Sequence, residues 1–168
     1  MGRPAARILD PVAHPAPPVL QPGPGSPTVF IGGKPAWRGV PAGVGAGVQA
    51  AKATSDATIK TAEAATLAAV GTPGYGAAKA AEQAVKASAG SAMSATITAA
   101  AGGADIHACT TLLPIPPHGP GVVIDGSPLV FINGLPACRQ GDTIIEALGP
   151  PNKIVIGLPT VLIGEDSG

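Results

Sequence analysis

The chain has 168 residues with ten basic and ten acidic side chains, so its formal net charge is zero. This balance leaves no basic patch for nucleic acid and no acidic tail, and the length suits one domain or one domain with an appendage. The 24 glycines and 20 prolines make the chain rich in turn formers, yet 45% hydrophobic residues are too many for a disordered protein.

The N-terminus, residues 2–7 (GRPAAR), is predicted to be a short strand rather than a targeting segment. It contains no apolar stretch of the kind found in a classical signal peptide, so we expect cytoplasmic synthesis, with export by another route. The stretch that follows at 15–24 (PAPPVLQPGP) cannot be helical, because five of its residues are proline, and it is predicted to run extended.

A β-hairpin is predicted at 25–38 (GSPTVFIGGKPAWR), and it recurs at 126–139 (GSPLVFINGLPACR). In each copy an apolar strand leads into a two-residue turn, Gly32-Gly33 or Asn133-Gly134, which supplies two positive φ angles. A short return strand then carries Pro-Ala-x-Arg. Proline fits a return strand only at an edge or at the strand start.

A third copy of this hairpin is divided between the two ends of the chain. Residues 157–164 (GLPTVLIG) match its first half, and residues 2–7 match its second half. We therefore expect the two ends to meet as neighbouring strands and to complete a ring of three hairpins. A repeat of this kind decides the fold class, which we predict to be mainly β.

The segment 41–103 differs in composition, because alanine dominates and charged residues recur at helical spacing. It predicts a helical hairpin over 44–70 and 77–100, interrupted by glycine and proline at 71–76. Charges every few residues argue against a membrane span. The insertion is either a packed surface appendage or a docking element for a partner or cargo, and it divides one β domain into 1–40 and 104–168.

Candidate metal ligands follow the repeats. An Asp comes after the Arg of each hairpin, and the fourth residue after each Asp is His14, Cys109 or Glu146. Three-fold repetition would bring these three side chains toward one axis. His118 approaches the same point, and so does His107, which shares a strand face with Cys109.

Histidine, cysteine and carboxylate side chains are zinc ligands, and four of them close a structural site. The predicted set is His14, His107, Cys109 and His118, with Glu146 as the rival for the place of His107. The other cysteine, Cys138, lies inside Pro-Ala-x-Arg, where the copies have Ala6 and Trp37. We expect it to be a reduced, metal-free packing residue.

The zinc is predicted to be structural, because four protein ligands would leave no position for a reacting water. The sequence also has no glycine-rich phosphate loop, no Ser-His-Asp order and no His-Glu-x-x-His motif. We therefore do not expect an enzyme. A small zinc hydrolase stays as an alternative, which an open, water-bound metal beside Glu146 would support.

These motifs together resemble those of PAAR-repeat proteins. The Pro-Ala-Ala-Arg of the name stands at 4–7, and degenerate forms stand at 35–38 (PAWR) and 136–139 (PACR). The resemblance covers 1–40 and 104–168. It implies a small cone of three hairpins with zinc near its vertex, and it places ligands at His14, Cys109 and His118. The sequence departs from many relatives at Glu146, where cysteine is common.

The resemblance also implies a function. The flat base of such a cone caps the trimeric, VgrG-type β-helical spike of a type VI secretion system or a related contractile injection machine, one chain per trimer. The metal-stapled point would puncture a target membrane. The chain would assemble in the cytoplasm and then be exported at the tip of the machine. An effector or cargo could ride on the insertion, in which case deletion of 44–100 would abolish cargo binding and leave spike capping intact.

Overall fold

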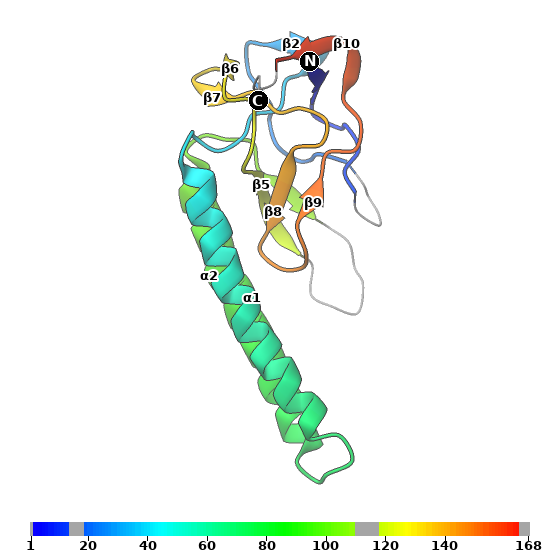
Figure 1. Ribbon diagram of the computed structural model, residues 1–168, viewed down its shortest axis with the longest axis vertical. Coiled ribbons are helices and arrows are strands. Elements are labelled where there is room, and N and C mark those ends of the chain that lie inside the picture. Colours follow the sequence, from blue (N-terminus) through cyan, green and yellow to red (C-terminus); the bar gives the residue numbers. More distant parts are fainter. Residues whose placement is uncertain (1, 14–18, 110–117, 165–168) are drawn as a thin grey trace.

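The computed structural model describes residues 2–13, 19–109 and 118–164, which form two helices and ten short strands (Figure 1). The strands are β1 (Arg3–Ala5), β2 (Phe30–Ile31), β3 (Lys34–Pro35), β4 (His107–Cys109), β5 (Gly119–Val123), β6 (Phe131–Ile132), β7 (Leu135–Pro136), β8 (Thr143–Glu146), β9 (Asn152–Lys153) and β10 (Leu158–Ile163). The helices are α1 (Val44–Ala68) and α2 (Tyr75–Ala101). With 35% helix and 27% strand, the structure is mixed α and β with much β, in which a helical hairpin accompanies the predicted β-hairpins.

The two complete hairpins form as the sequence predicts. β2 pairs with β3 and β6 pairs with β7, both antiparallel. The turn residues have φ angles of 56° and 79° at Gly32 and Gly33, and 52° and 78° at Asn133 and Gly134. Two successive positive φ angles twist a hairpin in the direction that strands favour. Asparagine adopts the left-handed region more readily than most residues, so Asn133 can replace a glycine there.

The two ends of the chain meet, as the divided third repeat predicts. β1 pairs antiparallel with β10, and Arg3 lies opposite Ile163. Figure 1 shows both ends on the same side of the molecule as β2, β6 and β7. Strands that begin and end the chain are thereby fixed in a sheet, which protects termini that otherwise fray.

A closed ring of backbone hydrogen bonds joins the three copies. The amide of Ala6 donates to the carbonyl of Cys138 (2.9 Å), Cys138 donates to Trp37 (2.9 Å), and Trp37 donates back to Ala6 (3.0 Å). Isolated bridges repeat the same cycle one position to each side, pairing Ala5 with Arg139, Arg7 with Ala36, and Arg38 with Ala137. The donors and acceptors are equivalent in all three copies, so the chain has three-fold pseudosymmetry at this ring.

Two apolar clusters lie on either side of the ring. One holds the first Ala of each Pro-Ala-x-Arg with an isoleucine from each hairpin: Ala5, Ala36, Ala137, Ile31, Ile132 and Ile163. The other contains Ala6, Trp37 and Cys138, all almost fully buried. Cys138 is thus a packing residue, as predicted. Burial raises the pKa of its thiol well above the ordinary value, which keeps it protonated.

Each copy also closes an Arg-Asp turn. The backbone amide of the Arg donates to the Asp carboxylate at 2.8 Å in Arg7–Asp10, Arg38–Asp105 and Arg139–Asp142. Two residues separate the pair in the first and third cases, whereas residues 39–104 separate it in the second. The helical insertion is therefore placed inside one such turn, and its two ends return to the positions that a two-residue connection would hold.

The insertion is a helical hairpin, as predicted, and it lies along the β structure and projects beyond it (Figure 1). Its inner half packs against β5 and β8 through an apolar cluster that includes Val48, Met93, Ile97, Val122 and Ile145. A glycine at Gly45 permits this approach, because a Cβ there would lie 2.3 Å from the carbonyl oxygen of Ile124. Neither helix has the length and apolarity that a membrane crossing requires, within the part of the chain described.

The outer half of the helical hairpin is held by polar contacts instead. Lys86 binds Glu82 within α2 and Glu63 across the hairpin, both at 2.7 Å. Lys79 also binds Glu82, at 2.9 Å, and Thr66 donates to the carbonyl of Ala78 (3.2 Å). Hydrogen bonds from Lys86, then Lys79 and Thr66, lower the pKa of Glu82 to about 2. We call the four charged residues, Glu63, Lys79, Glu82 and Lys86, the polar clamp.

Candidate metal centre

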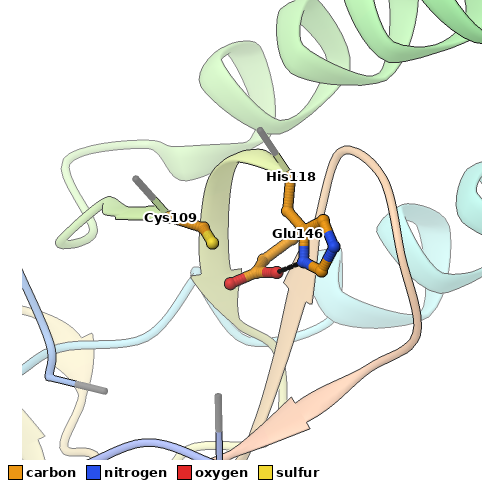
Figure 2. A group of neighbouring side chains, drawn as sticks. All are labelled: Cys109, His118 and Glu146. Atoms are coloured by element: carbon orange, nitrogen blue, oxygen red, sulfur yellow. Dashed lines mark hydrogen bonds and ion pairs between the residues drawn. The ribbon is translucent and has the colours of Figure 1, made fainter. Parts of the chain in front are cut away.

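The candidate centre is built on the four-stranded sheet, whose order is β4-β5-β8-β9. Cys109 is the last residue of β4, Glu146 is the last residue of β8, and His118 directly precedes β5, which lies between them. Three side chains that are distant in sequence therefore meet at one end of the central strand (Figure 2). Asp142 closes the third Arg-Asp turn, and the four residues from it to Glu146 along β8 span roughly 13 Å.

The three side chains lie close enough to hold a metal ion. One ligand atom from each of Cys109, His118 and Glu146 lies within 4.8 Å of the others. The Nδ1 atom of His118 is 2.9 Å from Oε2 of Glu146 (Figure 2). Around a tetrahedral ion with bonds of about 2.0–2.3 Å, ligand atoms lie roughly 3.3–3.8 Å apart. A movement of about 1 Å would bring the set to that spacing.

Glycines make room for two of these side chains. Gly121 pairs with His107 on one side and with Glu146 on the other. A Cβ on Gly121 would lie 2.8 Å from Cγ of Glu146. A Cβ on Gly149, which has a φ of +79°, would lie 2.7–3.0 Å from three atoms of the His118 ring. Both positions require glycine because the candidate ligand occupies the space.

The side chain of His107 contacts that of Glu146 across Gly121, which has no side chain to separate them. Its Nε2 atom lies 3.3 Å from Oε1 of Glu146, and both side chains are almost fully buried. The backbone amide of Gln21 donates to Nδ1 of His107 at 3.4 Å. His107 therefore lies beside the carboxylate oxygen of Glu146 that does not approach His118.

The structure brings together some of the residues expected from the sequence. Cys109 and His118 lie in one cluster, and the rival Glu146, rather than His107, is the third member. Cys109 and Glu146 each stand four residues after the Asp of their copy, so the repeat itself carries the signal for both. His14, which stands at the same position of the first copy, lies outside the described residues.

The donor set also fits a metal chemically. Glu146 is fully buried and Cys109 is 7% exposed, while the His118 side chain is 20% exposed. A buried carboxylate is costly unless hydrogen-bonding or ionic partners surround it. Thiolate, imidazole and carboxylate together can hold a divalent ion, and the ion in turn stabilises the charged forms of the thiol and the carboxyl.

Comparisons of the chain with models of known protein families, with curated proteins and with solved structures each returned no match. The resemblance to PAAR-repeat proteins consequently stays a prediction from the repeated residues.

Proposed function

We propose that this chain is a zinc-stapled tip that caps the three-fold spike of a contractile injection machine, of type VI secretion or a related kind. The observation that carries the proposal is the closed ring formed by Ala6, Trp37 and Cys138. A single chain with such a ring presents nearly the same surface three times. It can therefore match a symmetric trimer, which an ordinary asymmetric monomer cannot do.

The surface around the hairpins supports this docking. Phe30, Phe131 and Leu162 occupy the same position of the three copies, and they are 60%, 50% and 60% exposed. Large apolar side chains that repeat around an axis and stay exposed indicate an interaction surface. We call these three residues the apolar triad. In the proposal it faces the end of the trimeric spike, and short strand edges nearby extend the strands of the spike.

Zinc is the metal we propose for the centre, because thiolate and imidazole ligands favour it. Cys109, His118 and Glu146 would supply three ligands, and His14, at the equivalent position of the first copy, would supply the fourth. A closed site of this kind is structural. Structural zinc contributes on the order of 10–16 kcal/mol in zinc-finger peptides, which would stiffen a point that has little apolar core. Stiffness at the point serves membrane puncture.

The test combines the chain with a trimeric spike protein from the same organism and measures stoichiometry by native mass spectrometry. We expect one chain and one zinc per trimer. A triple variant, Phe30→Asp, Phe131→Asp and Leu162→Asp, should lose the complex but keep its metal and its helical circular dichroism. The matched control places the same three charges on exposed positions of the insertion, Ala53→Asp, Ala57→Asp and Ala64→Asp. A triad variant that still caps the spike would overturn the proposal.

A cargo adaptor is the second candidate, and one observation favours it. A groove of about 510 Å³ runs between α1 and α2 and is lined by small or apolar side chains without charge, among them Ala51, Thr58, Ser88, Ala92 and Thr96. Deleting 44–100 would also uncover the apolar cluster beneath the helices. The sharper test is Ser88→Arg with Ala92→Arg, which should block a cargo helix and leave spike capping unchanged.

A further inference from the structure

The free end of the helical hairpin carries large apolar side chains that the rest of the insertion does not expose. Leu67, Val70 and Tyr75 are 74%, 60% and 43% exposed. Among the described residues of α1 and α2, no other large hydrophobic side chain is exposed. Large exposed apolar side chains on the described part of the insertion are therefore confined to the end of the hairpin.

The surrounding sequence is uncharged. Residues 64–78 contain no Asp, Glu, Lys or Arg, and the nearest charges are Glu63 and Lys79, both members of the polar clamp. The clamp ties the two helices together directly behind the end. We call residues 64–78 the apolar cap.

We propose that the apolar cap inserts into the surface of a lipid bilayer. Glu63 lies four residues before Leu67, and Lys79 lies four residues after Tyr75. At 1.5 Å per residue, the charged clamp begins about 6 Å behind these side chains. Apolar segments that lie at a membrane surface enter to a depth of about 5–10 Å. The distance of about 6 Å between the cap side chains and the first charges thus falls within the depth to which such segments enter a bilayer.

Charge favours a lipid partner as well. The cationic groups behind the cap are Lys60, Lys79 and Lys86, and the acidic groups are Glu63 and Glu82, which leaves one net positive charge. Lys60 stands seven residues before Leu67, about 10 Å along the helix and level with lipid phosphates. The tyrosine suits the interface, where its ring is apolar and its hydroxyl is solvated.

The shape of the end argues against a folded partner. Figure 1 shows the turn between α1 and α2 as the free end of a projecting rod. A convex end offers a rigid protein little area to bury, whereas a specific protein interface needs about 800 Å² from each side. A fluid bilayer surrounds a convex end instead. The groove between the helices is lined by residues of 51–58 and 84–96, outside the cap.

Sedimentation of the full chain with vesicles tests this inference. One set of vesicles contains phosphatidylcholine alone, and the other contains phosphatidylcholine mixed with phosphatidylglycerol. We expect partitioning into both, several-fold stronger on the anionic set. The variant Leu67→Ser with Val70→Ser should lower the partition coefficient about tenfold. A matched control, Ala53→Ser with Ala57→Ser, changes exposed positions of α1 outside the cap and should leave partitioning unchanged.

Two further variants make the result specific. Tyr75→Trp should give an emission shift to shorter wavelength with vesicles, over a constant background from the fully buried Trp37. The variant Phe30→Ser with Phe131→Ser should bind vesicles as the wild type does. The inference is overturned if the wild type stays in the supernatant, if the cap variant binds undiminished, or if only the Phe30 and Phe131 variant loses binding. It is also overturned if the cap binds a protein but the chain does not bind vesicles. None of these results bears on spike capping.

Discussion

Substitution of Gly121 by alanine tests whether the candidate centre depends on the space that this glycine leaves in β5. The added Cβ would lie 2.8 Å from Cγ of Glu146, 3.1 Å from Cγ2 of Ile144 and 3.1 Å from the carbonyl oxygen of Ile145. The last contact is backbone in the adjacent strand, so the methyl group cannot be accommodated by a rotamer change alone. Glu146 must move, and with it one candidate metal ligand.

Overpacking of this kind costs about 1–3 kcal/mol in well-packed cores. For a chain of this size, each kcal/mol lowers the melting temperature by roughly 2–4 °C. We therefore expect Gly121→Ala to melt about 2–12 °C below the wild type. Because the displaced residue belongs to the candidate centre, the metal content of the purified variant should also fall.

Differential scanning calorimetry and elemental analysis on the same samples measure both effects. The matched control is Gly47→Ala, which lies inside α1 where an added Cβ meets nothing within 4 Å. It should stabilise the chain, since alanine is favoured over glycine in a helix by about 0.8–1.0 kcal/mol. If Gly121→Ala has the melting temperature and the full metal content of the wild type, the candidate centre does not depend on the space beside Gly121.

Three further predictions follow from charges and thiols. Asp105→Asn removes a buried carboxylate from Arg38, and it should cost about 3–5 kcal/mol in urea unfolding, more than Asp10→Asn, whose arginine is less buried. Because the pKa of Glu82 is lowered to about 2 in the folded chain, its stabilisation is present above the ordinary glutamate pKa. Stability should therefore fall as pH drops from about 4.5 toward 2, and Glu82→Gln should flatten that dependence when helical circular dichroism is followed. A chelator should expose Cys109 to thiol reagents, as mass spectrometry would record, whereas the fully buried Cys138 should react only after unfolding.

Local chemistry made much of the fold predictable. The Gly32-Gly33 and Asn133-Gly134 pairs specify their turns, because few residues other than glycine and asparagine accept positive φ angles. The match between the two chain ends and the complete hairpins predicted the pairing of β1 with β10. Alanine content and charge spacing predicted both helices to within two residues at each end.

The choice between His107 and Glu146 could not be made from the sequence. It depends on the register of β4 and β8 against β5, which places both residues opposite Gly121. These strands are short, so their register follows from tertiary packing rather than from an alternating pattern. The apolar cap was missed for a different reason. Leu67 and Val70 resemble ordinary core positions of a helix until the structure shows that nothing covers them.

The position of the insertion links these features. Because Arg38 and Asp105 form the same contact that Arg7 and Asp10 form locally, the ring keeps its three-fold pattern despite the inserted residues 39–104. The helices start at the ring and pass the sheet that carries the candidate centre, and their free end lies far from both chain termini (Figure 1). In the proposed assembly the apolar triad faces the spike, so the apolar cap would be the first part to reach a membrane. A cap variant that still docks on the spike but no longer partitions into vesicles would separate these two roles within one chain.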